Sequence, residues 1–238
     1  MSHVNYVGWA QFAGDILTEH GLALPDAEPP PRLLECACGT GSVAIHLGRK
    51  GYAVDAFDGS AEMIEIARCK ARGMRHSPRW MISSFADLEV DSDYDAALCL
   101  YDSVNYLMHG SAVLDYFTRI KRALKPLGLF LFDVCTEHNS LSHFADGSVE
   151  ECVGSGYYRR VMIYRRQRRI QENLFYIHPD KNGDEVYLER HRQRIFALAD
   201  IRRYITEAGL KLLEESDDIT RRPPSAGSMR VHFLAQKD

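Results

Sequence analysis

Residues 33–41 read Leu33-Leu34-Glu35-Cys36-Ala37-Cys38-Gly39-Thr40-Gly41, an apolar run that leads into a turn of small residues. After a short helix-compatible segment, Ala53-Val54-Asp55-Ala56-Phe57-Asp58 forms a second apolar run that ends in an acid. This order predicts a strand, a glycine turn, a helix and a second strand, which together hold an adenosine-type cofactor. Small residues let the backbone approach the ligand, and we expect the Asp58 carboxylate to accept hydrogen bonds from the two ribose hydroxyls.

The glycines alone leave the class of cofactor open. Residues 39–44 also satisfy the G-x-G-x-x-A pattern of dinucleotide-binding proteins, so a nicotinamide or flavin enzyme is one alternative. Glu35 favours a different ligand, because a carboxylate at the end of the first strand takes up the room that a pyrophosphate needs. The same carboxylate suits a ligand that carries an ammonium group and a sulfonium.

Four motifs that follow one another in the chain resemble those of class I S-adenosylmethionine-dependent methyltransferases. The turn at 35–41 is similar to the family's D/E-x-G-x-G-x-G, and Asp58-Gly59-Ser60-Ala61-Glu62-Met63 is similar to its D-x-S-x-x-M. Residues 94–106 and 124–133 resemble the motifs of the family's fourth and fifth strands, and residues 228–237 carry a weaker echo. The resemblance implies S-adenosylmethionine as the cofactor, S-adenosylhomocysteine as the product, and no metal.

The resemblance also implies which residues hold the cofactor. The expected contacts are Tyr6, Trp9, Glu35, Ala37, Cys38, Gly39, Thr40, Gly41, Asp58, Gly59, Met63, Ser84, Phe85, Ala86, Leu100 and Tyr101. Tyr6 and Trp9 lie on a leading helix that covers the methionine moiety in this family, although such spacing is also typical of core aromatics. Two positions depart from the family pattern. Ala37 replaces the first glycine, and Ser84 replaces an acid that binds the adenine amino group, so Asp87 either takes over that role or caps a turn.

Asp102-Ser103-Val104-Asn105-Tyr106 follows the predicted fourth strand. In the resembled family this position lies beside the transferred methyl group, so Asp102, Asn105 and Tyr106 are the candidates on the acceptor side. A helix cap is the alternative role at Asp102. His138 and His178 are candidate bases, with a surface or core role as the alternative for each.

The same segment favours a small-molecule acceptor. It lacks the N/D-P-P-Y/F sequence that is common in family members that methylate the amines of nucleic-acid bases. Its D-S-x-N-Y form resembles small-molecule N- and O-methyltransferases, including glycine-type and natural-product enzymes. An RNA- or protein-directed methyltransferase and an NAD-dependent oxidoreductase are the alternatives. Arginines crowd residues 159–169 and 190–194, which indicates either an anionic acceptor or nucleic acid, or else a solvated outer face of strands.

The order of elements predicts an α/β fold with a Rossmann-like doubly wound sheet, mostly parallel with an antiparallel last strand. Long alternating runs at 157–168, 170–178 and 185–196, with an Asn182-Gly183 turn, predict a small antiparallel β-sheet inserted after the fifth strand. We expect residues 1–30 to cover the cofactor, residues 31–145 and 198–238 to form the cofactor-binding core, and residues 146–197 to form a lid.

Composition fits one compact enzyme. The 238 residues carry a net charge of −4, which is too mild to indicate nucleic acid or a membrane surface as a partner. The six cysteines show no metal-ligand spacing, and no stretch is apolar over the roughly 18 residues of a membrane-spanning helix. We therefore expect a cytoplasmic protein with reduced thiols, a monomer or a homodimer.

Overall fold

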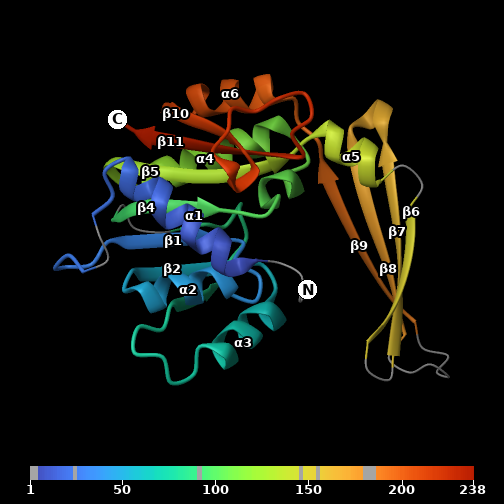
Figure 1. Ribbon diagram of the computed structural model, residues 1–238, viewed down its shortest axis with the longest axis horizontal. Coiled ribbons are helices and arrows are strands. Elements are labelled where there is room, and N and C mark those ends of the chain that lie inside the picture. The colour runs from blue at the N-terminus through green and yellow to red at the C-terminus, as the bar shows by residue number, and fades with distance from the viewer. Residues whose placement is uncertain (1–4, 24–25, 90–92, 145–146, 154–155, 179–185) are drawn as a thin grey trace.

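Two β-sheets and six α-helices make up the part of the chain that is described. The computed structural model describes residues 5–23, 26–89, 93–144, 147–153, 156–178 and 186–238. The central sheet has seven strands in the order β10-β11-β5-β4-β1-β2-β3 (Figure 1). Its strands are β1 (Arg32–Cys36), β2 (Ala53–Asp58), β3 (Arg79–Ile82), β4 (Tyr94–Cys99), β5 (Leu124–Cys135), β10 (Leu210–Asp217) and β11 (Arg230–Lys237).

Strand directions in this sheet agree with the predicted topology. The neighbours β3-β2-β1-β4-β5 are all parallel, whereas β11 runs antiparallel to both β5 and β10. The strand order reverses between β1 and β4, because β2 lies on one side of β1 and the later strands lie on the other. Ligands of open α/β sheets bind at the carboxyl ends of the strands at such a point. The predicted Rossmann-like fold is confirmed.

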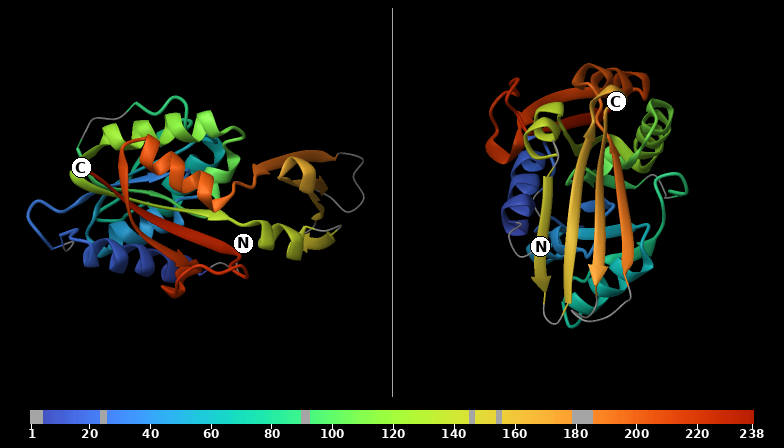
Figure 2. Two further views of the ribbon diagram at one scale, coloured as in Figure 1. Left: turned by 90° about the horizontal axis from the view of Figure 1, so that it is seen from above. Right: turned by 90° about the vertical axis from the view of Figure 1, so that its right-hand side faces the viewer.

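Helices cover both faces of the central sheet. The helices α1 (Tyr6–Glu19), α2 (Ser42–Lys50) and α3 (Ala61–Lys70) pack on one face, and α4 (Gly110–Ala123) and α6 (Leu198–Glu207) pack on the other (Figure 2, left). In α4 the buried residues recur with helical spacing, at Val113, Tyr116, Phe117 and Ile120. The core strands are apolar on both faces, since helices bury both.

The second sheet is antiparallel, as predicted, but it has four strands where the sequence indicated three. Its strands are β6 (Gly147–Val153), β7 (Gly156–Arg165), β8 (Ile170–His178) and β9 (Tyr187–Arg194), in that order. Alternation is weak over 147–153, so β6 was not predicted; the Asn182-Gly183 turn lies outside the described residues. The short helix α5 (Glu137–His143) leads from β5 to this sheet, which stands beside the carboxyl ends of the central strands (Figures 1 and 2).

Hydrogen bonds join the two sheets next to β4. The Asn105 Nδ2 donates to the carbonyl of Arg194 at 2.7 Å, and its Oδ1 accepts from the Cys135 N–H at 2.9 Å. The Gln193 Nε2 donates to the Asp102 carbonyl at 3.2 Å. The four-stranded sheet is therefore fixed to the segment where β4 ends.

Among the helices that the structure describes, none combines the length and the apolar character that a bilayer crossing requires.

Candidate functional site

The carboxyl ends of β1 and β4 bring together two loops that we name the switch-point site, residues 37–41 and 100–102. In the sheet Glu35 is paired with Leu98, so the two loops leave the sheet side by side. Gly39 and Gly41 have φ of +54° and +70°, which side chains with a Cβ rarely adopt. A Cβ on Gly41 would lie 2.3 Å from the Trp80 ring, whereas a Cβ on Gly39 would meet nothing within 4 Å. Gly41 is therefore needed for packing, and Gly39 borders open space.

Ala37 occupies the left-handed region in the same turn, with a φ of +53°. This backbone conformation costs a residue with a Cβ roughly 1–2 kcal/mol. We expect Ala37→Gly to raise the free energy of unfolding by about 0.5–1 kcal/mol, because the relieved strain exceeds the entropy that glycine adds to the unfolded chain. Urea unfolding measures the effect. Ala86→Gly is the control, since the φ of Ala86 is not positive, and an Ala37→Gly protein no more stable than this control would contradict the strain.

Asp58 stands at the end of β2 and contacts the glycine turn directly. Its Oδ2 accepts from the Gly39 N–H at 2.8 Å, and its Oδ1 accepts from the Ser60 N–H at 2.9 Å. Each oxygen keeps a lone pair for a further donor. The Lys70 ammonium donates to the Thr40 hydroxyl at 2.6 Å and so ties the other side of the turn to α3. Asp58 thus positions the turn and still has acceptors for ribose hydroxyls.

Glu35 is a buried carboxylate with one oxygen unused. Its exposed fraction is 4%, and its Oε2 is enclosed without a hydrogen-bond partner among the described residues. Burial raises the pKa of Glu35 to about 8, against the lowering effect of the Ala44 N–H. An enclosed carboxylate of this kind is stabilised by a cation. The ammonium group of a bound amino acid fits it.

The adenine side of the site differs in part from the sequence-based expectation. The Ser84 hydroxyl donates to Asp87 at 2.6 Å and accepts from the Asp87 N–H at 3.2 Å, so Ser84 and Asp87 cap a turn together. The Phe85 ring packs against Tyr116 in the core, with 4.5 Å between centroids. Ala86 is exposed, and so are the apolar Met63 (39%) and Ile82 (56%). Ile82 was not among the predicted contacts, although it ends the strand β3 just before the expected adenine segment.

The leading helix lies against the β4 loop. The Trp9 and Tyr101 rings are 5.5 Å apart, and the Arg230 guanidinium carbon lies 4.9 Å from the Trp9 ring and 4.7 Å from the Tyr101 ring. Tyr6 is half-buried, and Gly59 is exposed next to Asp58. Cys38 and Leu100 are buried in the core cluster under α1 and α2, so only their backbones are placed to meet a ligand. Arg230 was not predicted, because only the weak echo at 228–237 pointed to that strand.

The residues predicted to lie on the acceptor side differ in their exposure and in their hydrogen-bond partners. Tyr106 is exposed, and its hydroxyl lies 3.0 Å from Nδ1 of His191 on β9. Asn105 is completely buried with its amide bonded to backbone on both sides, so it joins the sheets and does not face an acceptor. His138 is exposed on α5. His178 alternates with Phe175 along β8 and therefore lies on the opposite face from His191.

Asp102 combines a strained backbone with a side chain that is 15% exposed. It has a φ of +61° and follows Tyr101, whose φ is +66°. The Asp133 carboxylate accepts from both N–H groups, at 2.6 Å from Tyr101 and 2.8 Å from Asp102. Arg230 donates from Nη2 to Asp102 at 2.8 Å. Two consecutive left-handed residues persist where the surroundings over-determine them, which is typical of functional loops.

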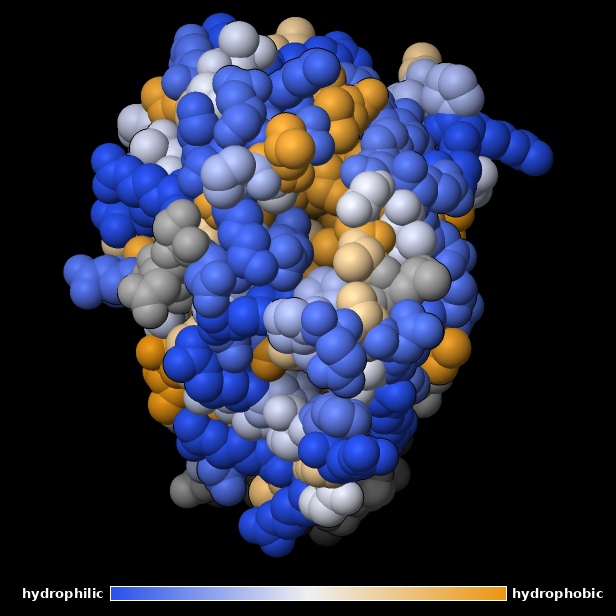
Figure 3. All heavy atoms as spheres, turned by 90° about the vertical axis from the view of Figure 1, so that its left-hand side faces the viewer, coloured by the Kyte–Doolittle hydropathy of each residue, from blue (hydrophilic) through white to orange (hydrophobic). Residues whose placement is uncertain are grey.

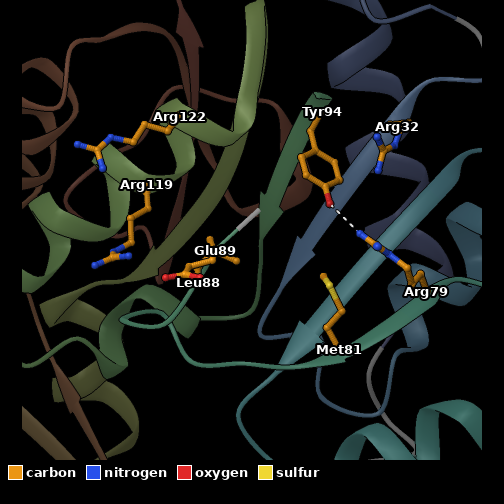
Figure 4. A pocket seen from close by; sticks show the side chains of 8 residues that line it. All are labelled: Arg32, Arg79, Met81, Leu88, Glu89, Tyr94, Arg119 and Arg122. Carbon is orange, nitrogen blue, oxygen red and sulfur yellow. Dashed lines mark hydrogen bonds between the residues drawn. The ribbon is translucent and has the colours of Figure 1, made fainter. Parts of the chain in front are cut away.

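A hollow lies at the edge of the central sheet where the parallel strands begin, opposite to the edge that carries the switch-point site. Figure 3 shows this face, with apolar side chains gathered in its upper half within a mostly hydrophilic surface. A cavity of about 570 Å³ opens at this edge, lined by Arg32, Arg79, Met81, Leu88, Glu89, Tyr94, Arg119 and Arg122 (Figure 4). Arg79 donates to Asp55 at 3.0 and 2.7 Å, and Arg32 donates to it at 3.1 Å. These arginines already have acidic partners, and the cavity is remote from the switch-point site.

Comparison with known proteins identifies the family. The sequence profile of a family described as "Methyltransferase domain" matches residues 33–128. A protein of Geobacillus sp. (strain WCH70), provisionally named a methyltransferase, is 31% identical over 241 residues, which span 100% of this chain and 95% of the relative. The chain belongs to the class I S-adenosylmethionine-dependent methyltransferases. S-adenosylmethionine is its cofactor and S-adenosylhomocysteine its product.

Solved structures share the methyltransferase's fold over its whole length. An S-adenosylmethionine-dependent methyltransferase from Clostridium acetobutylicum ATCC 824 superposes with a TM-score of 0.85 at 23% identity, covering 99% of this chain and 93% of the other. An amino pentose methyltransferase from Micromonospora echinaspora, solved with S-adenosylmethionine bound, gives a TM-score of 0.74 at 19% identity, with coverage of 100% and 93%. Within the described part of this methyltransferase, no group of three or more His, Cys, Asp or Glu side chains is arranged to hold a metal ion.

Proposed function

We propose that this methyltransferase moves the methyl group of S-adenosylmethionine to a nitrogen or oxygen atom of a small molecule by in-line displacement. The observation that carries the proposal is the contact of 3.0 Å between the Tyr106 hydroxyl and His191, because it makes the four-stranded sheet one wall of the acceptor side. A nitrogen acceptor is favoured, since the similar Micromonospora enzyme acts on an amino pentose.

Aromatic side chains continue this wall along the four-stranded sheet. The Phe175 ring meets the His191 ring edge to face at 5.6 Å, and the Tyr158 ring lies 5.9 Å from Phe175. Pockets for small ligands are lined in this way, with apolar and aromatic groups around a few polar ones. The wall therefore suits a small acceptor that carries an apolar or ring-shaped part.

Three arginines of the four-stranded sheet are neutralised by one buried acid, which supports a small acceptor over RNA. Glu172 is 1% exposed and receives three of them, Arg190 at 2.7 Å, Arg165 at 2.9 Å and Arg192 at 3.2 Å. Burial alone would raise the pKa of Glu172, but the hydrogen bonds from Arg190 and Arg165 outweigh it and lower that pKa. A cluster of this kind holds the strands together on the face opposite to His191.

The chain's own residues position the reactants. Glu35 would bind the ammonium group and Asp58 the ribose hydroxyls, while residues 1–30 cover the cofactor and residues 146–197 act as the lid over the core formed by 31–145 and 198–238. The bound cofactor supplies a methyl group that its sulfonium has already activated. Tyr106 would then hold the acceptor atom about 3 Å from the methyl carbon, in a site from which the lid excludes water. A reducing compartment, the cytoplasm, fits the described cysteines, whose thiols are all free.

Labelled methyl transfer tests the proposal. The protein is incubated with S-adenosylmethionine that carries a deuterated methyl group and with a cell extract separated into small molecules, RNA and protein. We expect the label in one compound of the small-molecule fraction, and NMR of that compound distinguishes N-methyl from O-methyl. Label found only in RNA or protein would reject a small-molecule acceptor. Formation of S-adenosylhomocysteine without label in any of the three fractions would reject methyl transfer to an acceptor.

A further inference from the structure

Two carboxyl groups, one buried and one partly exposed, share one guanidinium next to the loop 100–102. We call Asp102 and Asp133 the carboxyl pair. Asp133 is 0% exposed, and Asp102 has a side chain that is 15% exposed. Arg230 contacts both, with Nη2 2.8 Å from Asp102 Oδ2 and Nε 3.4 Å from Asp133 Oδ2. Two carboxylates against one cation leave a net negative charge unless one of them is protonated.

The hydrogen bonding of the pair indicates a shared proton. The Asp102 Oδ1 is enclosed and receives no hydrogen bond from the described residues. Both carboxyl groups contact the same guanidinium, and the net negative charge of this largely enclosed cluster is removed when the two groups share one proton. Burial raises the pKa of Asp102 to about 7, Arg230 opposes that shift, and Asp133 adds to it.

The groups that face the pair come from four segments. They are Arg230 from β11, Asp218 from the 3₁₀ turn at Asp218–Thr220, Tyr101 and Tyr106 from the β4 loop and Cys135 from β5; His232 in turn faces Arg230. Arg230 is the cation that contacts the pair, and Arg160 of β7 also acts on Tyr101 and Tyr106. An added positive charge therefore enters an environment with an excess of acids.

The pair also lies next to the switch-point site. Asp102 is the last residue of the loop 100–102, which leaves the sheet beside the glycine turn. A cavity of about 270 Å³ adjoins it, lined by Asn5, Trp9, Tyr101, Asn139, Asp218, Met229 and Arg230. A positive charge bound at the switch-point site would act on the pair by Coulomb interaction, which extends over several ångströms where water is partly excluded.

We propose that the carboxyl pair distinguishes the cofactor from the product by its proton. The positive sulfonium of S-adenosylmethionine favours the fully ionised pair and expels the shared proton, whereas the neutral thioether of S-adenosylhomocysteine leaves that proton in place. This inference rests on the proposed position of the cofactor at residues 37–41, 58 and 100–102.

Bonds, charge and protons are balanced through the reaction. The acceptor lone pair forms the new bond to the methyl carbon, the C–S bond breaks, and its electron pair stays on sulfur. The acceptor nitrogen or oxygen then gives up one proton. Since the sulfonium charge has gone, the pair takes up a proton again, and it becomes ionised once more when the next S-adenosylmethionine replaces the product.

Calorimetric titration at pH 7 in phosphate and in Tris tests this, because the difference in observed heat between two buffers counts the protons released. We expect S-adenosylmethionine to release about half a proton more than S-adenosylhomocysteine does. Glu35 can also lose a proton when a ligand binds, so the release that depends on Asp102 is the difference between the wild type and Asp102→Asn. In Asp102→Asn the excess release disappears, and the preference for S-adenosylmethionine over S-adenosylhomocysteine falls about three- to tenfold. Asparagine tolerates a positive φ and keeps an oxygen for Arg230.

Asp115→Asn is the matched control, since it removes one negative charge from exposed α4, where Asp115 pairs with Arg119. We expect Asp115→Asn to release as many protons as the wild-type protein does when each ligand binds. Equal proton release by the two ligands in the wild-type protein would overturn the proposal without any variant, as would an excess that persists in Asp102→Asn. Failure of both ligands to bind would instead reject the proposed cofactor position, and the inference with it.

Discussion

Asp58→Ala is expected to weaken binding of S-adenosylhomocysteine by at least about 100-fold while the protein stays folded. Hydrogen bonds from two ribose hydroxyls to a carboxylate are worth roughly 1.5–3 kcal/mol each. The substitution also frees the Gly39 and Ser60 N–H groups that Asp58 holds. Calorimetric titration measures the affinity, and circular dichroism checks the fold.

Two further variants make this result specific. Glu65→Ala removes an exposed acid from the neighbouring helix α3 and is expected to leave the affinity unchanged. Asp58→Asn keeps one acceptor for the turn but loses the charge, so its affinity should lie between those of Asp58→Ala and the wild type. An unchanged affinity in Asp58→Ala would show that the ribose lies elsewhere.

Arg230→Met is expected to lower the free energy of unfolding by about 3–5 kcal/mol. The change leaves two buried carboxyl groups without their cation, and breaking a buried ion pair from one side costs about that much. It also removes the contact of the guanidinium with the Trp9 and Tyr101 rings, whereas methionine retains much of the apolar stem. Urea unfolding monitored by fluorescence gives the value.

The pH dependence of that loss identifies its cause. Burial already raises the pKa values of Asp102 and Asp133 in the folded protein, and removal of Arg230 raises them further. The folded state then binds more protons than the unfolded chain between about pH 4 and the raised pKa values, so stability falls as the pH rises through that window. We expect the deficit of Arg230→Met to be smaller at pH 5 than at pH 8, and Asp102→Asn in the same chain to recover part of it. A deficit independent of pH would indicate lost packing and not unpaired charge.

Local sequence patterns predicted most of the central sheet, including the turn and the acid of the candidate cofactor site. Residues 33–41 and 53–58 act through neighbours in the chain, so the strand, the turn and the acid at Asp58 are visible in the sequence. Arg230 could not be assigned, because its partners Asp102 and Asp133 lie about a hundred residues earlier and meet it only when β11 pairs with β5. Asn105 also depends on distant parts of the chain. Its motif predicted a contact with the acceptor, whereas in the structure its amide joins the two sheets.

Two segments connect the four-stranded sheet to the rest of the chain. They are α5, which precedes β6, and residues 195–197, which lie between β9 and α6. The turn at 37–41 and the acid at Asp58 belong wholly to the central sheet. A change confined to the four-stranded sheet would consequently alter the proposed acceptor wall without altering the turn and the acid that we propose hold the cofactor.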